Sequence, residues 1–306
     1  MLRPSLQRGK DRPKPFPIQH PSPFHGETAA KAAGYDSHMN LFDLTNKTAI
    51  VTGACGLIGR QHCAALAGAG ANVVVADLNA EAAAAVAFGL GGGPHLSVAV
   101  DVTSPESLAA ARDQILARFG HIDVLVNNAA INDMFENPAL AADLSKFENF
   151  PLATFQKVLE VNVTGVFLAA QVFGTPMARQ GHGSIINVAS TYGIVGPDQS
   201  IYRNEAGEQT FYKSPSYPMT KGAVVNFTRY LAAYWGAAGV RVNTLSPGGV
   251  ENSQDEFFVK QYSAKTPLGR MATPTDYQGA VVFLASDASA YMTGANLVVD
   301  GGWTAI

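Results

Sequence analysis

From residue 48 onward, short runs of β-branched and aliphatic residues alternate with longer stretches rich in Ala and Leu. Such runs are typical of strands that are buried on both faces. The predicted strands are 48–52, 72–77, 96–101, 122–127, 184–189, 240–245 and 296–300. This order predicts an α/β fold with a doubly wound parallel sheet of about seven strands and helices on both faces. Because no second compositional block or internal repeat follows, we expect one folded domain over residues 39–306.

The first 38 residues differ in composition from the rest of the chain. Their prolines interrupt any periodic pattern, and basic residues outnumber acidic ones. The segment lacks the apolar stretch of a secretory signal, and its prolines disfavour the amphipathic helix of a transit peptide. We therefore expect residues 1–38 to be a disordered tail, or a segment added ahead of a native start at Met39.

Charge and hydropathy argue against two classes of partner. The formal net charge of the 306-residue chain is −3, whereas a nucleic-acid-binding protein needs a basic excess to neutralise phosphates. The apolar residues lie in short runs, and we expect none to reach the roughly 18 residues that span a bilayer. We expect neither a nucleic acid nor a membrane as partner.

The cysteines and histidines do not suggest a metal site. Cys55 and Cys63 are the two cysteines, and their spacing is neither that of a disulfide framework nor that of a metal-binding pair. The seven histidines are scattered without metal-ligand spacing. We expect no bound metal and a reducing, cytoplasmic compartment.

The first predicted strand leads into a glycine-rich turn, Thr52–Gly59, which a helical stretch follows. Glycine lets a backbone approach a pyrophosphate closely, and a helix N-terminus offers unpaired N–H groups to the phosphates. This order predicts a dinucleotide site of the Rossmann type. The residues expected at the cofactor are Gly53, Cys55, Gly56, Leu57, Ile58 and Gly59.

Asp77 ends the second predicted strand, 18 residues after Gly59. A carboxylate at this place accepts hydrogen bonds from the adenosine ribose and repels a 2′-phosphate. Neither the glycine turn nor Leu78 and Asn79 supplies a Lys or Arg for that phosphate. We therefore expect NAD in preference to NADP. The alternative role for Asp77 is the N-cap of the next helix.

Tyr217 and Lys221 are four residues apart, so on a helix their side chains face the same way. A Tyr-x-x-x-Lys spacing arises by chance in about one of three chains of this composition. The position of the pair in the chain is therefore more informative than its presence. It follows the strand that leads to Ser190, and Pro218 is tolerated in a first helical turn.

With these elements in this order, the chain resembles the short-chain dehydrogenase/reductase family from about residue 41 to its end. The matching elements are the Thr52–Gly59 turn, Asp101-Val102, Asn127-Asn128-Ala129-Ala130, Asn162, Ser190, Tyr217-x-x-x-Lys221, Pro247-Gly248 and Thr293-Gly294 leading to Val299-Asp300-Gly301-Gly302. Within the family, Phe147-Glu-Asn-Phe-Pro and Pro267-Leu-Gly-Arg-Met-Ala are similar to stretches of flagellin-modification and sugar-acid oxidoreductases.

The resemblance implies roles for four catalytic residues. Tyr217 would be the general acid/base, and Lys221 would supply the cation that lets a tyrosine with a pKa near 10 act at neutral pH. Ser190 would bind the substrate oxygen, and Asn162 would position a water in a proton relay. The further cofactor contacts implied are Asp101, Val102, Asn128, Ala129, Pro247, Gly248 and Val250, beside Tyr217 and Lys221 themselves.

Two long segments are expected to border the substrate. Ser190 and Tyr217 are 27 residues apart, about twice the usual spacing in the family, and the extra residues fall at 197–214. The other long segment is 131–149. Long loops in compact domains are often functional lids, although they also serve as oligomer contacts or solvated surface. The expected substrate contacts are Asn132, Tyr192, Gln199 and Arg203, with Arg203 a candidate for a carboxylate or phosphate.

The sequence thus predicts an NAD-dependent oxidoreductase that interconverts a secondary alcohol and a ketone on a sugar, polyol or hydroxy acid. The glycine spacing of the turn also fits sugar epimerases and dehydratases that retain NAD. A cofactor-sensing protein without catalysis is a further alternative, which the Tyr217–Lys221 pair disfavours. By family analogy, the helices expected around 151–180 and 214–238 would build a homotetramer.

Overall fold

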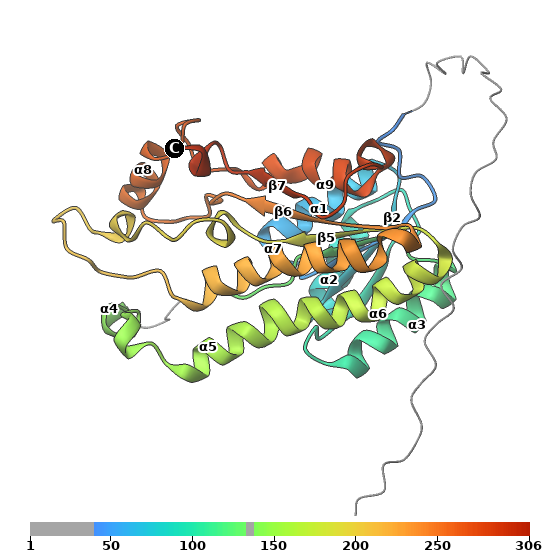
Figure 1. Cartoon of the computed structure of the whole chain (residues 1–306), viewed down its shortest axis with the longest axis horizontal. Coiled ribbons are helices and arrows are strands. Elements are labelled where there is room, and N and C mark those ends of the chain that lie inside the picture. The colour runs from blue at the N-terminus through green and yellow to red at the C-terminus, as the bar shows by residue number, and fades with distance from the viewer. Residues whose placement is uncertain (1–39, 133–137) are drawn as a thin grey trace, which may run out of the picture. The chain divides into compact units, whose positions relative to one another are not determined.

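The structure is a computed structural model that describes residues 40–132 and 138–306 (Figure 1). Seven parallel strands form one sheet in the order β3-β2-β1-β4-β5-β6-β7. The strands are β1 (Thr48–Thr52), β2 (Asn72–Asp77), β3 (Leu96–Ala99), β4 (Val124–Asn127), β5 (Gly183–Val188), β6 (Val240–Pro247) and β7 (Asn296–Val299). The predicted fold class is confirmed. The expectations for residues 1–38 lie outside the described residues.

Helices cover both faces of the sheet (Figure 1). The helices are α1 (Leu57–Gly68), α2 (Ala80–Gly89), α3 (Pro105–Phe119), α4 (Pro138–Leu144), α5 (Leu152–Leu159), α6 (Gly165–Gln180), α7 (Ser216–Trp235), α8 (Glu256–Ala264) and α9 (Gln278–Ala285). One buried apolar cluster joins the sheet to α3, α6 and α7, and a second joins the opposite face to α1, α2 and α9.

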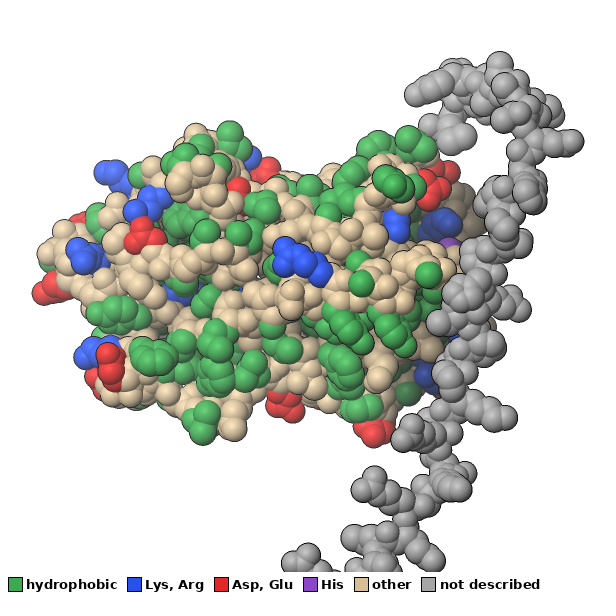
Figure 2. Space-filling model, in the orientation of Figure 1, with side chains coloured by type: hydrophobic (Ala, Val, Ile, Leu, Met, Phe, Trp, Pro, Cys, Tyr) green, Lys and Arg blue, Asp and Glu red, His purple; other side chains and the backbone are tan. Residues whose placement is uncertain are grey.

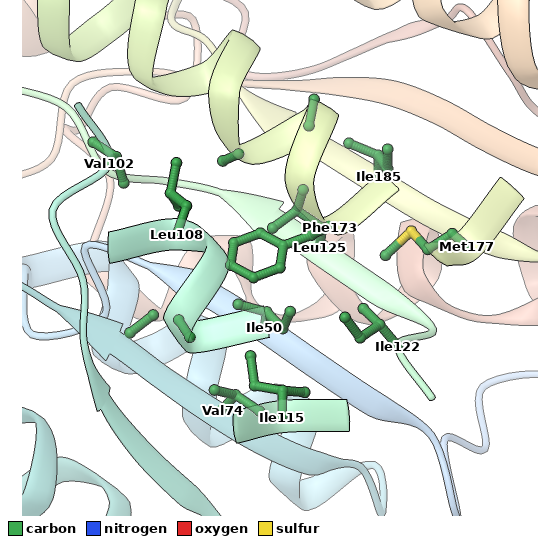
Figure 3. Close-up of a cluster of buried hydrophobic side chains, with 14 of the residues drawn as sticks. Ile50, Val74, Val102, Leu108, Ile115, Ile122, Leu125, Phe173, Met177 and Ile185 are labelled. Carbon is green, nitrogen blue, oxygen red and sulfur yellow. The ribbon is translucent and has the colours of Figure 1, made fainter. Parts of the chain in front are cut away.

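The alternation of side chains along each strand divides the core between these two clusters. Ile50 of β1 packs with Leu108 and Phe173 in the first cluster, as Figure 3 shows. Its neighbours Ala49 and Val51 belong to the second cluster. Because successive residues of a strand point to opposite faces, a strand covered on both sides must be apolar throughout. This is why the β-branched runs predict the strands so closely.

The strand order reverses between β1 and β4, and this reversal fixes the place of the functional site. Strands β2 and β3 extend the sheet on one side of β1, and β4 to β7 extend it on the other. The connections leave β1 and β4 in opposite directions, so a crevice opens at the carboxyl ends of these strands.

Helix α5, a π-helical turn (Glu160–Thr164) and α6 form one continuous helix from Leu152 to Gln180. By length and composition this helix could cross a membrane, with a mean hydropathy of 1.4 in its most apolar part. The expectation that no apolar stretch reaches this length was wrong. Its α6 part packs against α3, β4 and β5, so the apolar residues form part of the domain core.

His62 on α1 is completely buried, and neither ring nitrogen has a hydrogen-bond partner within the described part of the chain. Burial disfavours the charged imidazolium and lowers the pKa of His62 to about 4. Below the ordinary histidine pKa of about 6.5, the unfolded chain therefore takes up a proton that the folded chain refuses. The folded state loses stability as the pH falls through this interval.

We predict that His62→Leu weakens the acid sensitivity of the fold. Between pH 7.5 and pH 4.5, the free energy of unfolding of the wild type should fall by roughly 3 kcal/mol more than that of the variant. Urea denaturation at the two pH values measures both differences. An equal fall in the two proteins would show that His62 does not carry the effect.

Candidate active site

A cleft of about 850 Å³ opens at the carboxyl ends of the strands, at the crevice between β1 and β4. Its lining includes every predicted cofactor contact except Gly248, and the predicted substrate contact Asn132. These lining residues are Gly53, Cys55, Gly56, Leu57, Ile58, Gly59, Asp77, Asp101, Val102, Asn128, Ala129, Asn132, Tyr217, Lys221, Pro247 and Val250. Thus the glycine turn and the Tyr217–Lys221 pair share one cavity.

The glycine turn is shaped by its contact with the end of β4. Gly53 has a φ of +60°, and a Cβ there would lie 2.7 Å from Ala129 Cα, so only glycine fits. Asn128 Nδ2 donates to the carbonyl oxygens of Thr52 (3.0 Å) and Gly53 (2.9 Å). The N-cap of α1 is Gly56, which has no capping side chain. The first N–H groups of α1 therefore lie beside the cleft without a side-chain cap, an arrangement that fits a pyrophosphate.

Asp77 lies at the end of β2 with its carboxylate on the glycine turn. Cys55 N donates to Oδ2 (2.9 Å), and Asn79 N donates to Oδ1 (3.2 Å). The N-cap of α2 is Asn79, whose side chain accepts from Ala82 N (3.0 Å). The alternative N-cap role for Asp77 was therefore wrong. Because each carboxylate oxygen accepts more than one hydrogen bond, a ribose hydroxyl fits beside the backbone donors.

Two predicted cofactor contacts near the strand ends differ in their placement. Asp101 lines the cleft, and its Oδ1 accepts from the backbone N (2.8 Å) and the hydroxyl (2.7 Å) of Thr103. This turn explains why β3 ends at Ala99 rather than at Asp101 as predicted. Gly248 lies outside the cleft: its N donates to Val299 O (2.9 Å), and it lines a smaller adjacent cavity of about 140 Å³.

Helix α7 begins at Ser216 and presents Tyr217 and Lys221 to the cleft. The Lys221 ammonium is buried and donates to Val188 O at the end of β5 (2.9 Å). It lies 5.6 Å from the centre of the Tyr217 ring. Burial lowers the pKa of Lys221 to about 8. The structure therefore places a buried, anchored ammonium beside the tyrosine ring.

Ser190 follows β5 and begins a 3₁₀ turn, Thr191–Gly193. Its Oγ accepts from Tyr192 N (3.2 Å), and the residue is buried next to Ala189, which lines the cleft. A Cβ on Gly193 would lie 2.8 Å from the backbone of Lys221, so this turn packs directly on α7. The turn thereby fixes Ser190 relative to the helix that carries Tyr217.

Asn162 lies in the π-helical turn between α5 and α6 and is buried. Its Oδ1 accepts from Ile131 N (2.9 Å), and its Nδ2 donates to Ile131 O (3.0 Å) and to Thr220 Oγ1 (3.3 Å). Asn162 thus connects the segment after β4 to α7. Single π-helical turns inside α-helices are frequent at functional sites.

The predicted substrate residues separate into two groups. Asn132 lines the cleft, whereas Tyr192, Gln199 and Arg203 are not among its lining residues. Tyr192 is buried and its hydroxyl meets that of Tyr202 (3.3 Å). Arg203 lines another cavity, of about 500 Å³, between the 197–214 loop and α8, where its Nε donates to Gln209 Oε1 (3.3 Å). Of the segment 131–149, residues 133–137 lie outside the described residues.

The sequence interpretation missed Lys213. This lysine is buried, with its ammonium 4.5 Å from the centre of the Tyr217 ring and hydrogen-bonded to Asn132 Oδ1. It stands four residues before Tyr217, as Lys221 stands four after, and this symmetry was visible in the sequence. Because α7 begins only at Ser216, helical spacing could not place the Lys213 side chain.

Within residues 40–132 and 138–306, no group of three or more His, Cys, Asp and Glu side chains is placed to hold a metal ion.

Residues 53–304 match a family model described as enoyl-(acyl carrier protein) reductase. D-threitol dehydrogenase of Mycolicibacterium smegmatis is 39% identical over 270 residues, which cover 86% of this chain and 95% of that protein. The 3-alpha-(or 20-beta)-hydroxysteroid dehydrogenase of Mycobacterium tuberculosis is 37% identical over 262 residues, covering 86% and 91%.

A solved structure of a gluconate 5-dehydrogenase from Burkholderia cenocepacia, in complex with NADP and tartrate, has a TM-score of 0.76 and 32% sequence identity to this chain. The match covers 87% of this chain and 98% of that one. The family model covers strands β2 to β7, the glycine turn from Gly53 onward and the helix that carries Tyr217 and Lys221. The chain therefore belongs to the short-chain dehydrogenase/reductase family, whose members here are oxidoreductases that act on CH–OH groups.

Proposed function

We propose that the protein oxidises a secondary alcohol to a ketone, and catalyses the reverse reduction, with NAD as the hydride carrier. One observation carries the proposal: Tyr217, with the buried Lys221 ammonium beside its ring, lines the same cleft as the glycine turn. A general acid/base and a dinucleotide cradle in one cavity are what hydride transfer from a carbinol requires.

The chain's own residues handle the proton of the reaction. A bound nicotinamide would supply the acceptor for the hydride of the carbinol carbon. Tyr217 takes the hydroxyl proton, and the Lys221 ammonium stabilises the phenolate form of Tyr217 by its positive charge. Ser190, fixed by the turn that packs on α7, would hydrogen-bond the substrate oxygen. Asn162 would hold a water that returns the proton to solvent, and its bonds to Ile131 and Thr220 support a fixed position.

The cofactor proposed is NAD rather than NADP. The carboxylate of Asp77 lines the cleft at the end of β2, where the ribose 2′ position would lie. A 2′-phosphate there would meet a negative charge. Because the gluconate 5-dehydrogenase relative was solved with NADP, similarity to it does not predict the cofactor. The proposal of NAD depends on Asp77 of this chain.

The substrate proposed is a sugar, polyol or hydroxy acid. Relatives named for threitol and gluconate support this class, whereas a relative named for steroids shows how widely substrates vary at similar identity.

We assign these roles to one catalytic domain over residues 39–306. We also propose the cytoplasm as its compartment, because Cys55 and Cys63 are both free thiols.

We propose further that the protein is a homo-oligomer, a tetramer by family analogy, that buries an aromatic face of α6 and α7. Figure 2 shows hydrophobic side chains gathered over these helices. Phe167 is 46% exposed and Tyr230 61% exposed, and they border a hollow of about 580 Å³. Exposed apolar patches of this kind mark interfaces, and a second copy of the chain is the partner that symmetric oligomers use.

Tyr217→Phe should reduce turnover by at least about 100-fold, because the variant lacks the phenolate oxygen that accepts the proton. NADH binding, followed by fluorescence, should stay within about threefold of the wild type. Tyr291→Phe, at a fully exposed tyrosine, is the matched control. Unchanged turnover of the Tyr217 variant would overturn the assignment.

Asp77→Asn removes the charge but keeps an oxygen that can accept from Cys55 N. The wild type should prefer NAD over NADP at least about tenfold in kcat/KM, and the variant should lose most of that preference. Asp113→Asn, at an exposed carboxylate on α3, should leave the ratio as it is. A wild type that uses both cofactors equally would contradict the role of Asp77.

Tyr230→Lys should lower the molar mass of the protein in solution, measured by light scattering, because a charge in a buried apolar interface is costly. Phe88→Lys, at an aromatic residue 91% exposed on α2, should leave the mass unchanged. A monomeric wild type, or an unaltered mass for the Tyr230 variant, would refute the proposed interface.

A further inference from the structure

Residues 247–250, here called the 247–250 segment, form part of the cleft wall at the end that carries Tyr217. Pro247 and Val250 line the cleft, as Tyr217 does. Pro247 ends β6, which lies on the far side of β1 from β2 and its Asp77. The 247–250 segment therefore borders the half of the cleft proposed for the nicotinamide, away from the half proposed for the adenosine.

Two tyrosine hydroxyls bond to the backbone of this segment. Gly249 N donates to the Tyr262 hydroxyl (2.7 Å), and the Tyr277 hydroxyl donates to Gly248 O (3.1 Å). Both tyrosines line the cavity of about 140 Å³ beside the cleft, and neither is among the residues that line the cleft itself. Any effect of these hydroxyls on the cleft is therefore transmitted through the backbone of the two glycines.

The contact between Tyr262 and the segment leaves no room for a side chain, because a Cβ on Gly249 would lie 2.7 Å from Tyr262 Cζ. Tyr262 is buried, and burial raises its pKa against the opposing effects of Gly249 N and the Thr191 side chain on its hydroxyl. The hydroxyl is therefore protonated at neutral pH. It interacts both with the 247–250 segment and with the residue that follows Ser190.

The ring of Tyr262 is held in place by packing against distant parts of the chain. It stacks on Trp303, with ring centres 4.2 Å apart and an interplanar angle of 18°. Trp303 begins the C-terminal 3₁₀ turn, Trp303–Ala305. Ile201 of the 197–214 loop belongs to the same buried cluster as the two rings. The position of the Tyr262 hydroxyl thus depends on α8, on the C-terminal turn and on the 197–214 loop together.

We propose that Tyr262 is a positioning residue that holds the Gly249 peptide, and with it the nicotinamide side of the cleft, at a fixed separation from Ser190. Without the hydroxyl, Gly249 N loses its acceptor and the segment shifts to find another. Hydride transfer needs the two carbon atoms at close range, so a small shift of the wall lowers the rate more than it weakens binding. This inference rests on the proposed alcohol oxidation.

Tyr262→Phe tests the inference, because it removes the hydroxyl and keeps the ring that stacks on Trp303. With NAD and the fastest substrate from a panel of polyols and sugar acids, kcat should fall at least about tenfold. NADH should bind at least about threefold more weakly, whereas ADP-ribose, which lacks the nicotinamide, should bind within about twofold of the wild type. Calorimetric titration measures both affinities.

Ser184→Ala is the matched control for this variant. Ser184 is also buried, and its hydroxyl donates to a backbone oxygen, Leu284 O (2.7 Å), at the amino end of β5. The control therefore loses a comparable buried hydrogen bond far from the carboxyl ends of the strands. Its kcat and both of its affinities should equal those of the wild type.

Gly249→Ala tests the same contact from the side of the segment, should Tyr262→Phe fail to fold. The added methyl group meets the Tyr262 ring and displaces the peptide. We expect the same pattern of lower kcat, weaker NADH binding and unchanged ADP-ribose binding. Gly279→Ala on α9, where a Cβ would have open space, is the control and should behave as the wild type.

An unchanged kcat in both Tyr262→Phe and Gly249→Ala would overturn the inference. An equal loss of affinity for ADP-ribose and NADH would also overturn it, because that pattern describes a general loss of the cofactor site. Failure of the proposed function looks different. In that case the wild type oxidises no alcohol with NAD or NADP, while the ratio of NADH to ADP-ribose affinity still reports on the role of Tyr262.

Discussion

The hydrogen bond from the Lys221 ammonium to Val188 O fixes α7, the helix that carries Tyr217, to the sheet. Val188 ends β5, and its neighbours along the chain lead into Ser190 and the turn at Gly193 that packs on the backbone of Lys221. The Val188 carbonyl therefore sets the separation between the turn that follows Ser190 and α7, which carries Tyr217. The positive charge beside Tyr217 is held by the backbone of a buried strand, so it cannot move away with a surface loop.

A network of buried polar side chains on β4, β5, β6 and α7 fixes the position of α7 on the sheet. Asn127 Nδ2 donates to Asn187 Oδ1 (2.8 Å), and Asn187 Nδ2 donates to Thr228 Oγ1 of α7 (2.9 Å). Thr244 Oγ1 of β6 donates to the same hydroxyl (2.8 Å). Because buried polar groups are costly when unpaired, this chain across β4, β5 and β6 favours one position of α7.

Fold and cleft could be predicted from the sequence, because both depend on local patterns. Strands covered on both faces must be apolar, and the turn after β1 requires glycine at Gly53 because Ala129 lies against it. The substrate side could not be predicted in the same way. The path of the 197–214 loop depends on Gln199 reaching the backbone of Lys213 and on Asp198 reaching Lys265, contacts that no periodicity reveals. Arg203 and Lys213 lie ten residues apart in the same loop, and its path decides which of them lies beside Tyr217.

We propose that one cleft moves a hydride between a carbinol carbon and a nicotinamide dinucleotide while Tyr217 moves the proton. Deuterium can be followed from a substrate labelled at the carbinol C–H, with added NAD, by mass spectrometry of the cofactor. We expect one deuterium in the NADH released and none in NADH formed from unlabelled substrate in heavy water. Substrate that is isomerised or dehydrated with no labelled NADH released would contradict it and favour an enzyme that retains and recycles its cofactor.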